Sequence, residues 1–118
     1  MLKRFEMPEC PVEITLLLMG DRAGTSIIRD LLSGPKRLCE LSKSITTVST
    51  KMITQHLRIM EENGLVTRKV FPEVPPHVEY NLTEIGLSLE PIISAMWNWG
   101  SNYKNKYSAV CVKEHLER

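Results

Sequence analysis

The apolar residues in the first third of the chain recur at helical spacing. The run VEITLLLM follows Pro11 and stops at Gly20, which predicts a short helix with proline in its first turn. In SIIRDLLSG, apolar pairs one turn apart predict a second helix that ends at Gly34-Pro35. Two short helices with apolar faces are therefore expected before the middle of the chain.

Two further helices are expected on either side of a short turn. Leucine and isoleucine stand at helical spacing in KRLCELSKSI, and Cys39 in this segment is expected in the core. The tract TTVS forms the turn, with Ser49 or Thr47 as the N-cap of the next helix. That helix, TKMITQHLRIMEEN, ends at Asn63-Gly64, a common C-terminal signal.

The helix TKMITQHLRIMEEN has two faces of opposite character. One is a core-facing stripe of Ile53, Leu57 and Met60. The other lacks acids and combines basic with short hydrogen-bonding side chains: Lys51, Thr54, Gln55 and Arg58. Such side chains can contact phosphates and read base edges in a major groove. The acids Glu61 and Glu62 come at the far end, outside that groove. The alternative is the solvated polar face of any surface helix.

The apolar pattern changes its period after Gly64. LVTRKVF is rich in strand-forming residues, and Val78, Tyr80 and Leu82 alternate with polar residues. The tract PEVPP between them cannot pair in a sheet, because proline lacks an N–H donor. We expect a β-hairpin with a stiff, projecting tip, whose apolar residues cap the helical core. The alternating second strand argues against a linker or a proline-rich ligand.

A long helix is expected from Thr83, its N-cap, with Glu84 at the positive end of the helix dipole. Pro91 should kink this helix or start a new segment. One small domain would struggle to bury its wide apolar surface, so a homodimer interface is favoured over an intrachain core. The residues expected at that interface are Leu17, Ile92, Met96, Trp97, Trp99 and Tyr103.

Length and composition fit one soluble globular domain of 118 residues, with 42% hydrophobic and 25% charged residues. The run ITLLLM is too short to span a bilayer, and the acids and prolines before it do not fit a secretory signal, so no membrane association is expected. The three cysteines are odd in number and far apart, which indicates a reducing compartment, most simply the cytoplasm.

Positive charge is concentrated in the middle of the chain. The formal net charge of the whole chain is only +1, which predicts no partner. Between residues 36 and 69, however, seven basic side chains outnumber three acidic ones, a local net charge of +4. A nucleic-acid-binding surface has this distribution, although a solvated face can also produce it.

A short helix, a tight turn and a helix with an exposed polar face form a helix-turn-helix, and a hairpin directly after it makes the winged variety. The segments CPVEITLLLMG, LLSGPKRLCEL, STKMITQHLRIMEENGLVTRKVFPEVPPHVEYNLTEIGLSL and WNWG resemble the HxlR family of bacterial transcription regulators. The resemblance covers residues 10–100 and is strongest over residues 51–83. The fold class expected is mainly α with a small β-hairpin wing: a winged helix-turn-helix domain with flanking dimerisation helices.

The resemblance implies a cytoplasmic, homodimeric repressor that binds a palindromic operator in double-stranded DNA. One domain is expected over residues 1–118, with the helix-turn-helix at about 36–63, the wing at 65–82 and dimerisation segments at 1–20 and 83–118. No cofactor is implied, whereas a small-molecule or redox effector is a hypothesis. The implied DNA-contacting residues are Lys36, Arg37, Ser49, Thr50, Lys51, Thr54, Gln55, Arg58, Arg68, Lys69 and His77.

The chain departs from the family pattern at three places. The family more often has arginine at the position of His77, and Pro-Gly at the position of Thr46-Thr47. It usually has a lysine-tryptophan pair after Gly20, where this chain has DRAG. Loss of that tryptophan should loosen or reshape the space between the first helices and the dimer interface.

Cys10 stands just before Pro11, where the family frequently has a cysteine that some members use to sense oxidants or electrophiles. Cationic neighbours or a helix N-terminus could activate such a thiol, whereas a cysteine kept for packing is the plainer interpretation. We hypothesise that Cys111 of one subunit approaches Cys10 of the other.

Enzyme and metal sites are not indicated. The sequence has no glycine-rich phosphate loop and no nucleophile elbow, and its histidines lack ligand spacing with the cysteines. His56 lies between the two stripes of the recognition helix, the second helix of the expected helix-turn-helix at about Ser49 to Asn63, where a boundary residue is expected. The alternative function is a winged-helix module for protein–protein contact that does not bind DNA.

Overall fold

The computed structural model describes residues 7–117, and the side chains of residues 7–107. The chain forms two compact units, which meet between Ser88 and Leu89. The first unit contains α1 (Pro11–Met19), α2 (Arg22–Leu31), β1 (Lys36–Arg37), α3 (Leu38–Ser44), α4 (Thr50–Glu62), β2 (Val66–Phe71), β3 (His77–Leu82) and α5 (Glu84–Leu87). The second contains α6 (Glu90–Glu117). The expected fold class, mainly helical with a small β-hairpin wing, is confirmed.

The first two helices meet at a turn formed by Gly20 and Asp21. Pro11 occupies the first turn of α1, and Gly20 ends it with a φ of 76°, as expected. The predicted second helix is present as α2, which begins at Arg22, four residues before the tract SIIRDLLSG. Its N-cap is Asp21, whose Oδ1 accepts hydrogen bonds from the amides of Ala23 (3.0 Å) and Gly24 (3.5 Å).

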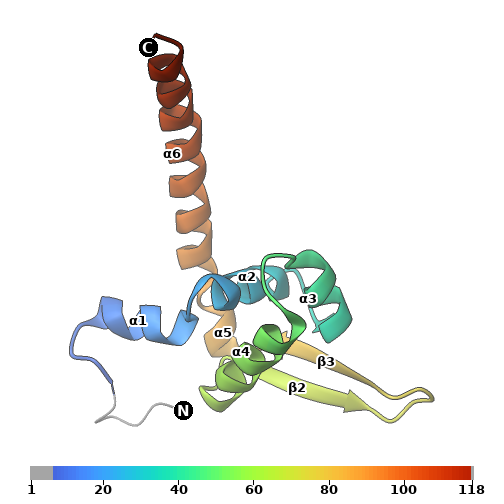
Figure 1. Ribbon diagram of the computed structural model, residues 1–118. Helices are drawn as coiled ribbons and strands as arrows, with labels where there is room; N and C mark the ends of the chain where they lie inside the picture. The colour runs from blue at the N-terminus through green and yellow to red at the C-terminus, as the bar shows by residue number, and fades with distance from the viewer. Residues whose placement is uncertain (1–6, 118) are drawn as a thin grey trace. The chain divides into compact units, whose positions relative to one another are not determined.

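The helix-turn-helix consists of α3, the turn of residues 45–49, and α4. The carboxylate of Glu40 accepts a hydrogen bond from the backbone amide of Arg37 at 3.0 Å, which stabilises the start of α3. Ser49, rather than Thr47, caps α4, since its hydroxyl accepts a hydrogen bond from the amide of Met52 at 3.2 Å. The predicted helices and turn are confirmed, and Figure 1 shows α3 and α4 in sequence.

The core of the first unit is formed by the apolar faces of the helices and the base of the hairpin. The predicted stripe of α4 is buried, and it packs with the buried face of α2. The largest side chains with almost no exposure are Ile27, Ile28, Leu31, Leu41, Ile53, Leu57, Leu65 and Val66. Each contributes about 1.5–3 kcal/mol through burial relative to full exposure.

The prediction that Cys39 lies in the core is wrong. Its thiol is exposed, whereas Leu41 is completely buried. Two residues correspond to about 200° of rotation around a helix, so the two side chains point to opposite sides of α3.

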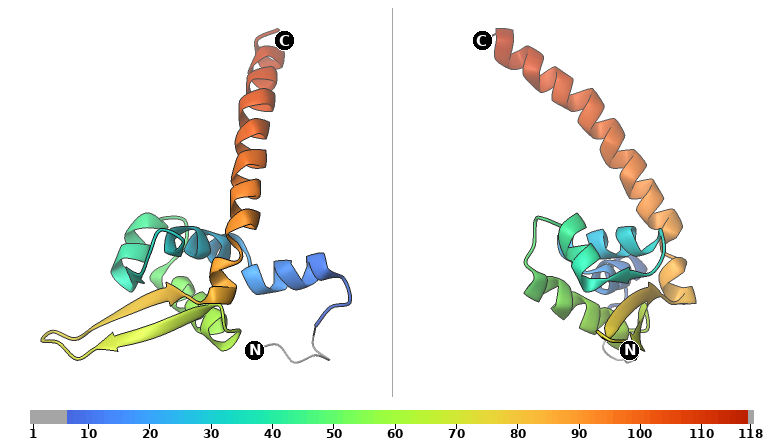
Figure 2. Two further views of the ribbon diagram at one scale, coloured as in Figure 1. Left: turned by 180° about the vertical axis from the view of Figure 1, so that it is seen from behind. Right: turned by 90° about the vertical axis from the view of Figure 1, so that its right-hand side faces the viewer.

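The sheet has three antiparallel strands in the order β1-β3-β2, one more than the sequence predicts. The extra strand is the two-residue β1, whose Lys36 and Arg37 pair with Tyr80 and Glu79 of β3. The predicted hairpin is confirmed, and Val66 and Leu82 pair at its buried base. Figure 1 and the left view of Figure 2 show the hairpin tip extending well beyond the helices.

Thr83 joins the hairpin to the short helix α5. Its hydroxyl accepts a hydrogen bond from the amide of Gly86 at 3.1 Å, which confirms it as an N-cap, and donates to the carbonyl of Gly64 at 2.6 Å. The helix that follows is not continuous: α5 ends at Leu87 and α6 begins at Glu90. Pro91 therefore lies in the first turn of a new segment, where its missing N–H costs nothing.

Helix α6 carries a row of exposed aromatic side chains. The ring of Tyr103 stacks on Trp99 at a centroid distance of 5.4 Å and contacts Tyr107 at 4.7 Å. Trp97 and Trp99 are 62% and 70% exposed. Within residues 7–117, no helix is long and apolar enough to cross a membrane.

Candidate nucleic-acid interface

The polar stripe predicted on α4 is exposed. Lys51, Gln55 and Arg58 are exposed, and Thr54 between them is half-buried, with its hydroxyl donating to the carbonyl of Thr50 at 2.9 Å. The stripe therefore presents an amide, a guanidinium and an ammonium group to solvent, on the side of the helix away from its buried residues. These are the groups that contact base edges and phosphates.

The two hydroxyl residues at the start of α4 make contacts that hold the helix-turn-helix together. Ser49 caps the helix through Met52, as described above. The Oγ1 of Thr50 lies 2.6 Å from the Oγ of Ser42 on α3, so one hydroxyl donates to the other. Both residues are exposed, and each hydroxyl keeps the capacity for a further hydrogen bond.

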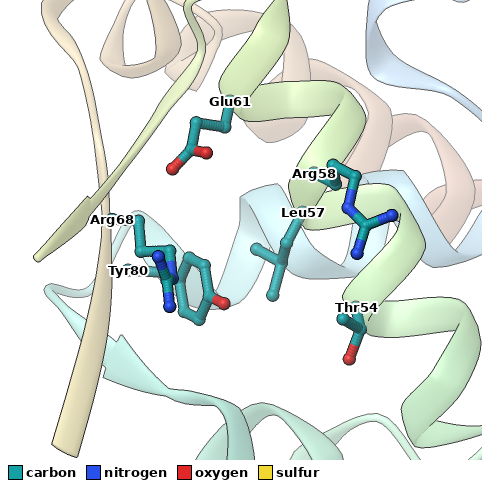
Figure 3. A pocket seen from close by; sticks show the side chains of 6 residues that line it. All are labelled: Thr54, Leu57, Arg58, Glu61, Arg68 and Tyr80. Carbon is teal, nitrogen blue, oxygen red and sulfur yellow. The ribbon is translucent and has the colours of Figure 1, made fainter. Parts of the chain in front are cut away.

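A cavity of about 320 Å³ lies between α4 and the hairpin. Its lining comes from three elements: Thr54, Leu57, Arg58 and Glu61 of α4, Arg68 of β2 and Tyr80 of β3. Figure 3 shows Arg68 and Tyr80 on the strand side, the α4 residues along the helix, and Leu57 between them. Three predicted DNA-contacting residues, Thr54 and Arg58 of α4 and Arg68 of β2, thus line the same cavity.

The electrostatic character of this cavity favours anions. Among the described residues, neither Arg58 nor Arg68 forms an ion pair with a carboxylate. The phenol of Tyr80 adds a hydrogen-bond donor that the sequence analysis missed. Glu61, which the sequence analysis placed away from the reading face, contributes one negative charge to the lining. Two unpaired guanidinium groups are well suited to a phosphate oxygen.

The basic residues of the sheet lie on its two outer strands, β1 and β2, with β3 between them. Arg68 and Lys69 of β2 are opposite Tyr80 and Glu79 of β3, and β3 also pairs with Lys36 and Arg37 of β1. Arg37, Arg68 and Lys69 are exposed, and Lys36 is half-buried. The structure thus brings the four basic residues of β1 and β2 onto one small sheet, although they are more than thirty residues apart in sequence.

His77 has a different environment from these basic residues. Its ring stacks on Phe71 at a centroid distance of 4.5 Å, and its two nitrogens lie 3.2 Å from Glu73 and 3.9 Å from Glu79. Its side chain is only 15% exposed. A phosphate approaching His77 would meet two carboxylates, so the geometry favours this residue least among the predicted contacts. Its DNA contact stays a prediction.

A model of the HxlR-like helix-turn-helix matches residues 18–108. The chain belongs to the HxlR family. It is 41% identical over 97 residues to the uncharacterized HTH-type transcriptional regulator YdeP of Bacillus subtilis, covering 82% of this chain and 76% of that protein. It is 37% identical over 106 residues to the HTH-type transcriptional regulator YodB of the same organism, covering 89% of this chain and 95% of YodB.

Solved structures of similar proteins have the same winged fold. The reduced form of the redox regulator HypR matches with a TM-score of 0.79 and 36% identity, covering 85% of this HxlR-family chain and 99% of HypR. The putative HTH-type regulator YtcD matches with a TM-score of 0.77 and 40% identity, covering 82% of this chain and 99% of YtcD. The chain is therefore a transcriptional regulator with a helix-turn-helix domain, and its relatives are regulators, not enzymes.

In this HxlR-family chain, the tract that replaces lysine-tryptophan after Gly20 has a structural role. The carboxylate of Asp21 caps α2 and lies 2.9 Å from Nε2 of His56 on α4. Partial burial acts to raise the pKa of Asp21, but hydrogen bonds from Ala23 and Gly24 and the neighbouring His56 outweigh it and lower the pKa below 3.8. The sequence analysis placed His56 correctly at the boundary between the stripes and missed its partner, which lies 35 positions earlier.

Proposed function

We propose that this HxlR-family regulator binds specific double-stranded DNA as a homodimer, with α4 in the major groove and the β2–β3 wing against flanking DNA. One observation carries the proposal: α4 exposes an acid-free polar stripe directly opposite its buried stripe. A helix that only needed solvation would gain nothing from excluding carboxylates over two turns. A helix that lies against phosphates gains affinity from excluding carboxylates, because each carboxylate would be repelled by the phosphates.

The proposed contacts divide by chemistry. Thr54, Gln55 and Arg58 read base edges, since their side chains can form hydrogen bonds in the major groove. The remaining residues contact the DNA backbone: Lys36, Arg37, Ser49, Thr50, Lys51, Arg68 and Lys69. At the cavity between α4 and the wing the two groups adjoin, because base-reading Arg58 and backbone-contacting Arg68 line the same cavity.

A second copy of the chain is the proposed partner of the exposed apolar surfaces. On α1, Val12, Leu16 and Leu17 are between 51% and 66% exposed. On α6 the exposed large apolar residues are Ile92, Met96, Trp97, Trp99, Tyr103 and Tyr107. So many large apolar side chains in solvent favour an interface. A two-fold dimer would recognise a palindromic operator and, by occupying it, repress transcription in the bacterial cytoplasm.

A redox signal is the effector that we propose for this regulator. Cys10 is exposed and occupies the N-cap position of α1, so its thiol is accessible to an oxidant. Two structural neighbours support this proposal: HypR is a redox regulator, and the structure of YodB from B. subtilis has been solved after treatment with diamide. The proposed partner Cys111 lies outside the residues whose side chains are described. The test is a non-reducing gel after diamide treatment: an oxidant-dependent dimer band that Cys10→Ser abolishes supports the proposal, and its absence overturns it.

The DNA-binding proposal is tested by gel retardation with the DNA upstream of the protein's own gene. Wild-type protein should retard this DNA at low salt and lose affinity steeply as salt rises, because binding releases counterions. Arg58→Ala should cost about 1–3 kcal/mol and relax specificity. Arg29→Ala is the matched control, since Arg29 is an exposed arginine of α2 paired with Asp30 and outside the proposed interface.

The alternative, a winged-helix module that contacts only proteins, makes the opposite prediction. If the protein contacts only proteins, no operator fragment should be retarded even at low salt, and Arg58→Ala and Arg29→Ala should give the same retardation result. Either result would overturn the proposed function.

A further inference from the structure

The imidazole of His56 lies between the recognition helix and the turn that begins α2. Its side chain is 18% exposed, and it stands between the buried stripe and the polar stripe of α4. A methyl group added to Gly20 would lie 3.6 Å from the ring, so the turn packs closely against the imidazole. The imidazole ring therefore lies between α4, which carries it, and the turn at Gly20.

Both ring nitrogens of His56 face groups that can only accept hydrogen bonds. Nδ1 lies 2.8 Å from the carbonyl oxygen of Met52 on the same helix, and Nε2 lies 2.9 Å from Oδ1 of Asp21. A carbonyl and a carboxylate have no proton to donate. Both contacts are hydrogen bonds only when both nitrogens carry protons, which is the imidazolium form. A neutral ring would leave one nitrogen lone pair against an oxygen.

The same carboxylate oxygen holds the start of α2. Oδ1 of Asp21 accepts the amide of Ala23 at 3.0 Å, and α2 packs against α4. Among the described residues, Asp21 is the only carboxylate within 4.0 Å of a His56 ring nitrogen. The groups facing the ring are thus this carboxylate and the Gly20 backbone from the turn, and the Met52 carbonyl from α4.

We propose that His56 is a positioning residue for DNA recognition: as an imidazolium it ties α4 to the N-cap of α2 through Asp21, and loss of one proton removes the charge from this contact and leaves only one of the two ring hydrogen bonds. The proposal rests on the proposed function for its consequence, because Gln55 is the neighbouring residue and Thr54 and Arg58 lie two positions away on either side. A change in how α4 sits on α2 moves these three side chains together relative to the wing.

The pH dependence follows from the chemistry of imidazole, which changes charge in the neutral range. As pH rises from 6 to 8 at constant ionic strength, operator affinity should fall by about 3–10-fold, because the hydrogen bond to Asp21 is no longer assisted by charge. Fluorescence anisotropy with a labelled operator fragment measures this dependence.

Two variants distinguish loss of the His56–Asp21 contact from a general loss of folding. Asp21→Ser keeps an N-cap side chain for α2 but is too short to reach His56, so its affinity at pH 6 should be no higher than that of wild type at pH 8 and should barely change with pH. His56→Gln supplies a neutral N–H donor to Asp21 at every pH, so it should bind at pH 6 with about the affinity of wild type at pH 8 and show no pH dependence. Asp30→Asn is the matched control, since it removes one negative charge from the other end of α2, where Asp30 pairs with Arg29 at 3.5 Å, and should keep the wild-type pH dependence.

A measurement without DNA distinguishes failure of this inference from failure of the proposed function. The ¹⁵N chemical shifts of the His56 ring at pH 7 report the imidazolium fraction, which should fall in Asp21→Ser and stay unchanged in Asp30→Asn. If wild type retards no DNA but these shifts behave as expected, the tie stands and the proposed function is overturned. If wild type binds DNA and all variants share its pH dependence, or if the ¹⁵N shifts of wild type and Asp21→Ser agree, the inference is overturned.

Discussion

Ser42 of α3 and Thr50 of α4 are joined by a hydrogen bond between their hydroxyls, with 2.6 Å from Oγ to Oγ1. This bond spans the turn of the helix-turn-helix and connects the supporting helix to the first residue of the recognition helix. Since Thr50 is also a proposed backbone contact, the bond orients a hydroxyl that would otherwise rotate freely.

Ser42→Ala should lower operator affinity a few-fold while costing only about 0.5–1.5 kcal/mol of unfolding free energy, the usual net value of one hydrogen bond. Ser44→Ala on the same helix is the control, because Ser44 is exposed and makes no side-chain hydrogen bond among the described residues. Anisotropy titrations and urea unfolding measure the two effects. Equal affinities for the two variants would show that the hydroxyl bridge does not orient Thr50.

Arg68→Ala should weaken binding by a similar factor on every DNA sequence and reduce the slope of log affinity against log salt by about 1, because one phosphate contact is lost. Arg58→Ala should differ by relaxing sequence preference. The contrast tests whether the two arginines that line the cavity have separate roles. A loss of specificity in Arg68→Ala would contradict the assignment of the wing to the DNA backbone.

Gly24→Ala should destabilise the fold by more than about 2 kcal/mol, among the larger effects of single substitutions. A methyl group at this position would overlap the carbonyl oxygen of Met19, and it would lie 3.2 Å from the Met60 side chain. Gly100→Ala is the comparison, since nothing lies within 4 Å of its added methyl group and alanine favours helix. The midpoint of thermal unfolding, followed by circular dichroism, should be lower than that of wild type for Gly24→Ala and not for Gly100→Ala.

Trp99→Ala should weaken the proposed homodimer at least tenfold. Its ring is 70% exposed in the chain and stacks on Tyr103, so it is an aromatic anchor of the kind that dominates interfaces. Sedimentation equilibrium measures the dissociation constant, and Asn102→Ala, another exposed residue of α6, serves as control. A wild-type protein that sediments as a monomer at micromolar concentration would rule out the dimer.

Acid should destabilise wild-type protein more than Asp21→Asn. The folded-state pKa of Asp21 is lowered, because hydrogen bonds from Ala23 and Gly24 and the nearby His56 outweigh the effect of partial burial. The stability that this carboxylate contributes is therefore complete above its ordinary pKa of 3.8 and is lost as pH falls through the folded value. Urea midpoints between pH 6 and pH 3 should converge for the two proteins, since asparagine keeps the cap but does not titrate.

The local order of the chain could be predicted because it depends on neighbours in sequence. The spacing of Ile53, Leu57 and Met60 determines the buried face of α4, and with it the opposite, polar face. The proline tract and the alternation after it determine a hairpin, since proline cannot pair and alternating residues suit a strand. In the same way, Thr83 and Pro91 mark helix starts by their own chemistry.

Much of what the sequence left open depends on groups that are far apart along the chain. The exposure of Cys39 and the cap of α2 at Asp21 are local features, whereas β1 pairs with a strand more than forty positions later, which periodicity does not identify. The contact of Asp21 with His56 and the cavity shared by Arg58 and Arg68 arise only when helices and strands pack. The sequence by itself therefore determined which elements form and which face of α4 is polar, since these follow from backbone geometry and burial. Only the tertiary structure decided which charges meet, because an ion pair or a cavity depends on distances that packing alone sets.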